Sequence, residues 1–187
     1  GPSSPLFKKL VSVPLYPYQR EGVLFDAKAG RCLLADDMGL GKTLQAIAAT
    51  ELLAQAVGVE RVLVVAPTSL KHQWKQEIAR LTARTVEVTE GFLSQRTAVN
   101  QRPSFFIITN YDVVHRDLEA IRAWAPDLII LDEAQRIKNW KTRTAQTIKQ
   151  LTSEHVIVLT GTPLENRLEE LHSLVEFVDR FHLGPRF

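Results

Sequence analysis

The chain has 187 residues, of which 23 are Lys or Arg and 21 are Asp or Glu, so its formal net charge is only +2. A hydrophobic content of 45% excludes whole-chain disorder, because it offers enough apolar surface to offset the entropy cost of folding. The single cysteine, Cys32, excludes an internal disulfide. No apolar run approaches the roughly 20 residues of a membrane-spanning helix, so we expect no membrane partner, and the small positive excess does not by itself predict nucleic-acid binding.

The two ends of the sequence differ in character from its middle. The first four residues, Gly-Pro-Ser-Ser, resemble the scar left when a protease removes a tag, and we interpret residues 1–14 as this scar and a short lead-in. Residues 183–187 follow a helical pattern without a polar tail and resemble a cut through a longer polypeptide. We therefore expect one domain over residues 15–184, a length typical of a single domain.

Short apolar runs alternate with longer stretches of helical spacing along the chain. The helical stretches place Leu44, Ile47, Ala48 and Leu52 on one face, and a second apolar set lies between residues 168 and 178. Because the apolar runs are continuous, they favour strands buried on both faces, as in a parallel sheet covered by helices. This order predicts an α/β fold, a three-layer sandwich with a mainly parallel sheet, whose ligands bind at the carboxyl ends of the strands. The predicted strands are residues 31–35, 62–66, 105–109, 128–131 and 156–159.

A glycine-containing loop follows the first predicted strand and precedes a predicted helix. Its glycines permit backbone conformations that turn several N–H groups toward one polyphosphate, and the helix that follows adds its positive dipole end. Lys42 can then bind the β and γ phosphates, and Thr43 can ligate Mg²⁺. Asp36 replaces the first glycine of the usual pattern, which leaves a chance Gly-Lys-Thr turn as the alternative, but the flanking strand and helix favour nucleotide binding. The predicted nucleotide-binding residues are Met38, Gly39, Leu40, Gly41, Lys42 and Thr43.

Two adjacent acids, Asp132 and Glu133, end the fourth predicted strand. Carboxylates at the end of an apolar strand suit metal-assisted phosphoryl transfer, with Asp132 holding Mg²⁺ and Glu133 orienting and deprotonating the attacking water. The alternative is a solvated acidic pair at a helix N-terminus, where the dipole favours negative charge. The preceding phosphate loop favours the first interpretation, so Glu133, Asp132 and Lys42 are the predicted catalytic residues.

Taken in order, these motifs resemble those of Swi/Snf-related ATPases, which belong to the second helicase superfamily. The resemblance covers residues 15–184 and rests on residues 36–43, on Asp-Glu-Ala-Gln at 132–135 with Ile-Lys-Asn at 137–139, and on Leu-Thr-Gly-Thr-Pro at 159–163. It implies a RecA-like helicase lobe of the P-loop NTPase type, with ATP and Mg²⁺ as cofactors and double-stranded DNA as a partner. Two positions depart from the family: Asp37 stands where Glu is usual, and Gln135 stands where many members have His, so we assign Gln135 no proton transfer.

The resemblance also implies roles that the residues' own chemistry would not single out. Residues 15–23 are similar to the family's adenine-reading segment, in which Gln19 hydrogen-bonds adenine; alone, Gln19 is typical of a polar residue at a helix N-terminus. Residues 66–70, with Gln73 and Trp74 on the following helix, resemble the family's first DNA-contacting motif, and residues 109–111 resemble the second. N–H groups and small hydroxyls there can hold a phosphate. Helix capping is the alternative for Thr68 and Ser69, a solvated face is the alternative for Lys138, and core packing is the alternative that we favour for Trp74. The implied DNA-contacting residues are Thr68, Ser69, Thr109, Asn110 and Lys138, and the residues implied to couple the lobe to its partner are Gln135, Thr160, Gly161 and Thr162.

Family members have two RecA-like lobes, and the second carries arginine fingers that complete the ATP site. No second-lobe motif follows residue 163, and an arginine finger is worth about 10³–10⁵ in rate, so we expect the isolated lobe to bind ATP weakly and hydrolyse it slowly. The implied function is ATP-dependent translocation along double-stranded DNA. The alternatives are a strand-separating helicase or restriction-type motor, a nucleotide-dependent DNA-binding module without turnover, and a small-molecule kinase. The composition favours a prokaryotic source, and hence a cytoplasmic, nucleoid-associated location rather than a nuclear one.

Overall fold

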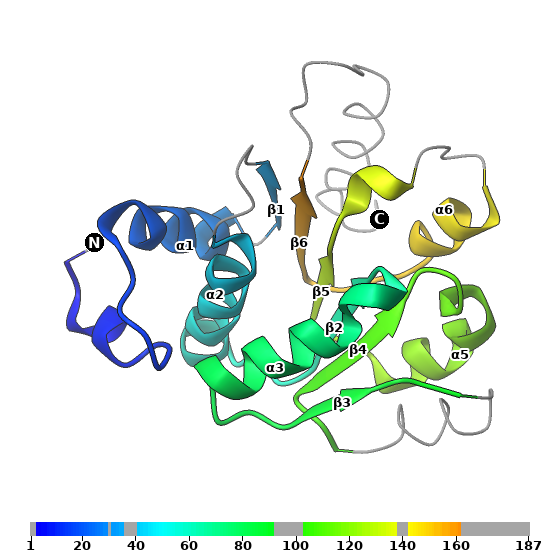
Figure 1. The fold of residues 1–187 in the computed structure, drawn as a ribbon, viewed down its shortest axis with the longest axis horizontal. Coiled ribbons are helices and arrows are strands. Elements are labelled where there is room, and N and C mark those ends of the chain that lie inside the picture. The colour runs from blue at the N-terminus through cyan, green and yellow to red at the C-terminus, as the bar shows by residue number, and fades with distance from the viewer. Residues whose placement is uncertain (1–2, 30, 36–40, 92–102, 138–141, 162–187) are drawn as a thin grey trace, which may run out of the picture.

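The computed structural model describes residues 3–29, 31–35, 41–91, 103–137 and 142–161, which form a sheet covered by helices (Figure 1). The strands are β1 (Arg31–Ala35), β2 (Val62–Ala66), β3 (Val86–Val88), β4 (Phe106–Asn110), β5 (Leu128–Leu131) and β6 (His155–Thr160). They pair in the order β1-β6-β5-β2-β4-β3, and every pair is parallel. The predicted α/β class and parallel sheet are therefore confirmed.

Strand β3 is the element of the sheet that the sequence pattern does not predict. It has three residues, all half-buried, and it lies at the edge of the sheet. Its Val-Glu-Val sequence lacks the continuous apolar run of a central strand and is too short for its alternation to indicate a strand. The other strands match the predicted runs to within a residue at each end, so the residues that follow them lie at the carboxyl edge of the sheet as expected.

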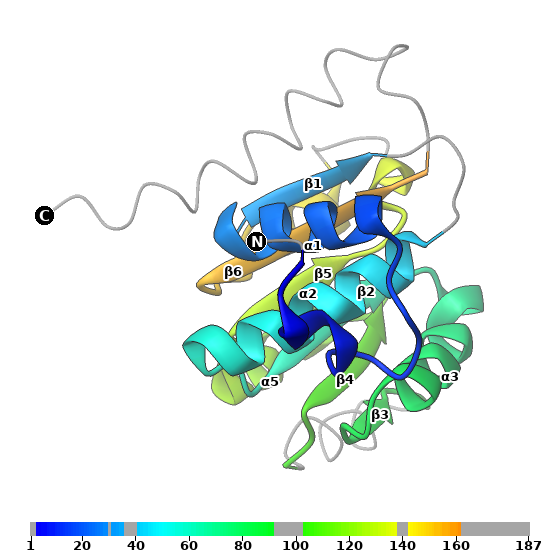
Figure 2. The same cartoon turned by 90° about the vertical axis from the view of Figure 1, so that its left-hand side faces the viewer.

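Helices cover both faces of the sheet and complete the three layers. Alternate strand residues point to opposite faces, so Val62 and Val64 join one core cluster while Leu63 and Val65 join the other. Helices α1 (Pro17–Ala29), α2 (Lys42–Val57) and α3 (Lys71–Leu81) pack on the first face, and α5 (Val114–Trp124) and α6 (Arg143–Ile148) pack on the second. Figure 2 shows α1 and α2 in front of the sheet. Short 3₁₀ helices occur at η1 (Pro5–Lys8), η2 (Thr68–Leu70) and η3 (Ala134–Arg136). The predicted helical face at residues 168–178 lies outside the described residues.

Helix α2 is buried over a wider arc than its predicted apolar face. Ile47 and Ala48 are fully buried as expected, but Leu44 and Leu52 are only partly buried. The N-terminal segment explains the difference, because Phe7, Leu10, Val11 and Leu15 belong to the same core cluster as α2. The core therefore extends toward the N-terminus beyond residue 15.

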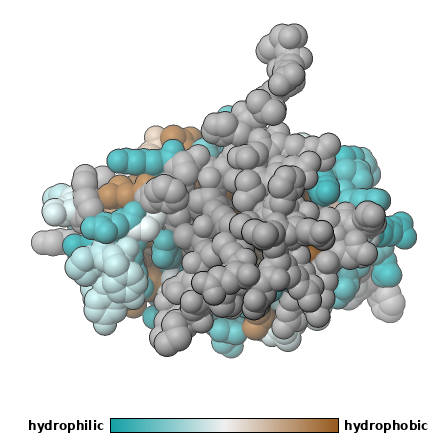
Figure 3. All heavy atoms as spheres, turned by 90° about the horizontal axis from the view of Figure 1, so that it is seen from above, coloured by the Kyte–Doolittle hydropathy of each residue, from teal (hydrophilic) through white to brown (hydrophobic). Residues whose placement is uncertain are grey.

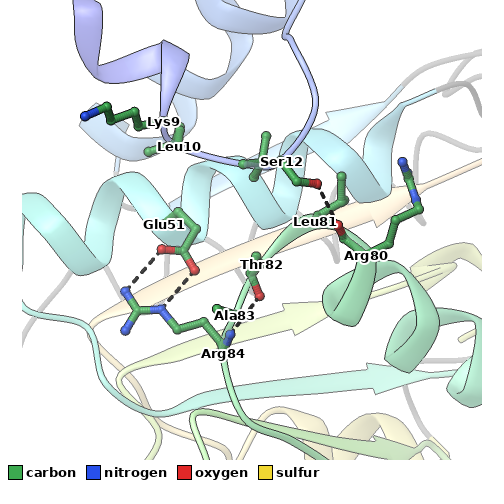
Figure 4. A pocket seen from close by; sticks show the side chains of 10 residues that line it. Lys9, Leu10, Ser12, Glu51, Arg80, Leu81, Thr82, Ala83 and Arg84 are labelled. Atoms are coloured by element: carbon green, nitrogen blue, oxygen red, sulfur yellow. Dashed lines mark hydrogen bonds and ion pairs between the residues drawn. The ribbon is translucent and has the colours of Figure 1, made fainter.

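A groove of about 780 Å³ separates this N-terminal segment from the connection between α3 and β3 (Figure 4). Ser12 joins its two walls: the Ser12 N–H donates to Leu81 O at 2.9 Å and the hydroxyl donates to Arg80 O at 2.6 Å. These bonds satisfy carbonyl groups at the C-terminus of α3. On the floor, Arg84 forms a bidentate ion pair with the buried Glu51 of α2, at 3.0 and 3.1 Å. The groove is thus braced by bonds between its own residues.

The visible surface of the described residues in Figure 3 is mostly hydrophilic, with small hydrophobic patches. Tyr16 and Tyr18 are the exposed aromatic residues of the described part, and their rings stack in parallel with centroids 6.0 Å apart. Among the described residues, no helix is both long enough and apolar enough to cross a bilayer.

Candidate functional site

The N-terminus of α2 faces the end of strand β6 at the carboxyl edge of the sheet. Lys42 is the first residue of α2, and its ammonium group donates to the main-chain oxygen of Thr160 at 2.8 Å. A helix N-terminus has free N–H groups and a positive dipole end, which together suit an anion such as phosphate. The strand and the helix predicted on either side of the loop are present, while the loop residues 36–40, with Met38, Gly39 and Leu40, lie outside the described residues.

Gln19 packs against the end of the phosphate loop. Gly41 precedes α2 with a φ of +99°, a left-handed conformation that favours glycine, and a Cβ there would lie only 2.8 Å from Gln19 Nε2. Gln19 is 4% exposed, and its Oε1 accepts a hydrogen bond from the Tyr16 N–H at 2.9 Å. This is a capping contact at the start of α1, and it leaves the amide nitrogen beside Gly41. Adenine recognition by Gln19 stays a prediction.

One pocket of about 410 Å³ collects the residues predicted to bind phosphate, bind metal and activate water. Lys42 and Thr43 line it from α2, and Asp132 and Glu133 line it from the end of β5. Gly161 lines it from the end of β6. The volume lies in the range of small-molecule sites, roughly 300–1,000 Å³. The pocket therefore places a cation and a hydroxyl opposite two carboxylates.

Asp132 is held by hydrogen bonds from several separate parts of the chain. Its carboxylate accepts from Trp74 Nε1 at 2.7 Å and from the Glu133 N–H at 2.9 Å. Its main-chain oxygen accepts from the Tyr111 hydroxyl at 2.6 Å, and its N–H donates to Val65 O at 2.8 Å. These bonds fix both the backbone and the side chain of Asp132.

Burial shifts the protonation equilibria of this group of residues. Burial raises the pKa of Asp132 above its ordinary value of 3.8; the Trp74 hydrogen bond opposes the shift, and the charge of Glu133 adds to it. Burial also raises the pKa of Tyr111 well above its ordinary value of 10.0, and the charges of Asp132 and Glu133 act in the same direction. The Tyr111 hydroxyl therefore keeps its proton, and acts as a donor, throughout the neutral range.

Glu133 has a backbone conformation that is uncommon for a residue with a side chain. Its φ is +49°, in the left-handed region, where non-glycine residues are rare and cluster at functional sites. Gln135 Nε2 donates to the Glu133 carboxylate, and Gln135 Oε1 accepts from the Gly161 N–H at 3.2 Å. The structure therefore brings Gln135, Thr160 and Gly161 of the implied coupling set to Glu133 and Lys42, while Thr162 lies outside the described residues.

The residues implied to contact DNA divide into an exposed pair and a buried pair. Thr68 and Ser69 are exposed in η2, directly after β2, and the Thr68 hydroxyl donates to Asp112 Oδ2 at 3.4 Å. Thr109 and Asn110 end β4 and are only 1% and 6% exposed, because β4 is covered by helices on both faces. The Thr109 hydroxyl oxygen is buried and has no hydrogen-bond partner among the described residues. The roles of these four residues and that of Lys138, which lies outside the described residues, stay predictions.

Trp74 and Tyr111 are contacts of the site that sequence reasoning did not assign. Trp74 is 2% exposed and lies in the core as expected, but its indole N–H also reaches Asp132. Tyr111 is visible in the sequence only as part of the motif at residues 109–111. Nothing in a single sequence indicates that either side chain meets Asp132, because the partners are distant along the chain.

Comparison with known proteins establishes the family. Residues 18–184 match the family profile described as the SNF2-related domain. The chain belongs to the SNF2-related family. A solved structure titled "Sulfolobus solfataricus SWI2/SNF2 ATPase core in complex with dsDNA" superposes with a TM-score of 0.82 and 32% identity, over 90% of this chain and 36% of that one.

Curated relatives of this SNF2-related domain come from bacteria, animals and plants. The "Putative ATP-dependent helicase/translocase YwqA" of Bacillus subtilis is 37% identical over 97% of this chain and 20% of its own length. The "DNA repair and recombination protein RAD54B" of Gallus gallus is 37% identical over 91% of this chain and 20% of its own length. The chain thus spans about a fifth of these relatives. It is an ATPase domain of the DNA-translocase or chromatin-remodeller type with a RecA-like fold, which confirms the Swi/Snf resemblance and sets the small-molecule kinase aside.

Proposed function

We propose that this SNF2-related domain binds ATP with Mg²⁺ and supplies one half of a motor that moves along double-stranded DNA. The observation that carries the proposal is the single pocket in which Lys42 and Thr43 face Asp132 and Glu133. A cation at a helix N-terminus suits phosphates, and paired acids suit metal-assisted hydrolysis. Two relatives support the DNA partner: the archaeal ATPase core is titled as a complex with dsDNA, and the Bacillus subtilis protein is named a helicase/translocase.

The oxygen donors in the pocket fit Mg²⁺. In nucleotide sites Mg²⁺ is held by one or two side-chain oxygens together with phosphate and water oxygens, and Thr43 and Asp132 supply such oxygens. Each carboxylate oxygen of Asp132 accepts one hydrogen bond from the described residues, which leaves lone pairs for a metal-bound water. Within the described part of the chain, no group of three or more His, Cys, Asp or Glu side chains could hold a metal by itself. When bound, Mg²⁺ neutralises phosphate charge.

The chain's own residues bind the phosphates and move the proton. Lys42, now bonded to Thr160 O, binds the β and γ phosphates of ATP. Glu133 accepts a proton from the water that attacks the γ-phosphate, which yields ADP and phosphate. Gln135 holds the Glu133 carboxylate and the Gly161 N–H at the same time, so it orients the base and links it to the end of β6.

The rest of the proposed motor is a second RecA-like lobe of the same protein. Such a lobe would complete the ATP site with an arginine finger, whose contribution is about 10³–10⁵ in rate, so this lobe alone turns over slowly. On the DNA side, the exposed Thr68 and Ser69 stand at the start of the segment that leads into α3, where hydroxyls and N–H groups can hold a phosphate.

Nucleotide binding by this chain tests the first half of the proposal. Lys42→Ala removes charge-assisted hydrogen bonds worth about 1.5–3 kcal/mol, so titration with a fluorescent ATP analogue and Mg²⁺ should show an affinity roughly 10-fold or more below that of the wild type. Lys75→Ala removes an exposed lysine of α3 and is the matched control, with unchanged affinity expected. Equal binding by the Lys42→Ala variant and the wild type would contradict the proposal.

Movement on DNA tests the second half, in a protein that also carries the second lobe. Displacement of a third strand from a triplex reports translocation, and release of one strand from a duplex reports strand separation. We expect ATP-dependent triplex displacement without strand release. Strand release at a similar rate would favour the strand-separating helicase, and neither activity despite ATP binding would favour the module without turnover.

A further inference from the structure

Both segments implied to contact DNA reach the same carboxylate-bearing residue through a buried aromatic side chain. Helix η2, with the exposed Thr68 and Ser69, leads directly into α3, and Trp74 in the first turn of α3 donates its indole N–H to Asp132 Oδ2 at 2.7 Å. Strand β4 ends at Asn110, and the next residue, Tyr111, donates its hydroxyl to Asp132 O at 2.6 Å. One aromatic donor therefore holds the side chain of Asp132 and the other holds its backbone.

We propose that Trp74 and Tyr111 are positioning residues that transmit DNA contact at η2 and at the end of β4 to the metal-binding carboxylate of Asp132. The inference rests on the proposed function, because the orientation of Asp132 matters for Mg²⁺ only if the pocket holds a Mg²⁺–nucleotide complex. It goes beyond that function by naming the side chains that join the DNA side of the lobe to the nucleotide side.

The two rings are held by packing, so their donor atoms follow the backbone. Trp74 lies in the core cluster on the α3 face of the sheet, and Tyr111 lies in the cluster on the α5 face. Each side chain has only two torsion angles, and close packing leaves it little freedom to compensate for a shift of its element. A movement of α3 or of the end of β4 therefore changes a hydrogen bond to Asp132.

Strand β2 adds a third connection between the same two regions. It lies between β4 and β5 in the sheet, and it continues through Pro67 into η2. Val65 of β2 accepts a hydrogen bond from the Asp132 N–H at 2.8 Å. The main chain of Asp132 is thus tied to strand β2, which leads into η2 and Thr68, while its side chain is tied to α3, which follows η2.

The first turn of α3 is also a wall of the nucleotide pocket. Leu70, Gln73 and Trp74 line the 410 Å³ pocket together with Lys42 and Asp132. The segment that exposes Thr68 and Ser69 to solvent therefore also places Leu70, Gln73 and Trp74 against the pocket. A displacement of this segment by DNA would change the shape of the pocket and the indole bond to Asp132 together.

Two substitutions remove the hydrogen bonds and keep an aromatic ring at each position. Trp74→Phe deletes the indole N–H, and Tyr111→Phe deletes the hydroxyl. Loss of a bond that orients a metal ligand lowers metal affinity by about 10- to 100-fold. We therefore expect Mg²⁺ to increase the ADP affinity of each variant by a factor roughly 10-fold smaller than in the wild type. ADP affinity in EDTA should stay at the wild-type value, because the indole N–H and the Tyr111 hydroxyl both donate to Asp132. A merely structural role would change both affinities or neither.

Calorimetric titration of the 187-residue chain with ADP, in Mg²⁺ and in EDTA, makes this comparison. Trp124→Phe is the matched control, since Trp124 is a partly buried tryptophan of α5 that does not line the pocket. If the wild type gains no ADP affinity from Mg²⁺, the proposed function fails and this inference fails with it. If Mg²⁺ raises the ADP affinity of the wild type, and raises that of Trp74→Phe and Tyr111→Phe by the same factor, only this inference fails.

The indole N–H resonance of Trp74 gives a readout that does not depend on the stability of either variant. In a Trp124→Phe, Trp140→Phe background, Trp74 is the only tryptophan left, so its indole signal is unambiguous in a ¹H–¹⁵N spectrum. We expect the signal to shift on addition of Mg²⁺–ADP, and again on addition of duplex DNA. A signal unmoved by duplex DNA that is bound, as judged by a shift of backbone signals in η2, would overturn the transmission.

Discussion

Replacement of Gly41 by alanine tests the contact between the phosphate loop and Gln19. Gly41 has a φ of +99°, and a left-handed conformation costs a residue with a Cβ roughly 1–2 kcal/mol. The new Cβ would also lie 2.8 Å from Gln19 Nε2, so the amide must move and give up its bond to the Tyr16 N–H, worth about 1 kcal/mol. We therefore expect Gly41→Ala to lower the free energy of unfolding by about 2–3 kcal/mol in urea denaturation.

Gly58 provides the matched control for this substitution. It also has a positive φ, +76°, but a Cβ there would meet nothing within 4 Å, so Gly58→Ala carries the backbone cost alone, roughly 1–2 kcal/mol. In a double-mutant cycle, Gln19→Ala should cost about 1 kcal/mol less in the Gly41→Ala background than in the wild type, because that background has already lost the bond from the Tyr16 N–H to Gln19. If Gly41→Ala and Gly58→Ala lowered the free energy of unfolding equally, and the cost of Gln19→Ala were the same in both backgrounds of the cycle, the packing of Gln19 against the loop would be refuted.

Two further predictions concern charged groups. Glu51→Ala leaves Arg84 without its bidentate partner and should lower the free energy of unfolding by roughly 2–3 kcal/mol. This loss is smaller than that for a fully buried ion pair, because the Arg84 side chain is 38% exposed. An unchanged urea midpoint would show that the ion pair adds nothing to stability. Because burial raises the pKa of Asp132, the folded chain binds more protons than the unfolded chain above the ordinary value of 3.8, so this group destabilises the fold as pH rises through its raised pKa. Asp132→Asn should therefore gain stability relative to the wild type as the pH rises above about 4, and a difference that is constant with pH would contradict the shift.

That the site residues lie close together could be predicted from the sequence, because of a general property of parallel sheets. Lys42, Asp132 and Gly161 each follow an apolar run, and the carboxyl ends of parallel strands meet at one edge. The order of the strands in the sheet was not predictable from the apolar runs, since each run indicates a buried strand but does not indicate which strands pair with it. The placement of β1 and β5 on either side of β6 is a result of the structure.

The contacts that hold the site together depend on tertiary packing and were not predictable. Trp74 is apolar enough to be expected in the core, but its bond to Asp132 arises only because α3 and the end of β5 meet in the fold. The motif at residues 109–111 suggested accessible polar groups, whereas the helices that cover the two faces of the sheet bury Thr109. Glu51 likewise occupies a helix position that would suit solvent, and it is buried because the segment around Leu10 and the residue Arg84 cover it.

The most direct test of the central claim is DNA-stimulated ATP hydrolysis by Glu133→Gln, in a protein that carries both lobes. Glutamine keeps the shape of the side chain and loses the base, whose contribution is typically about 10²–10⁴-fold, so hydrolysis should fall by at least roughly 100-fold while Mg²⁺–ATP affinity is retained. Glu119→Gln, an exposed glutamate of α5, is the control and should hydrolyse ATP as the wild type does. Hydrolysis by Glu133→Gln at the wild-type rate would contradict the assignment of this pocket as the catalytic site.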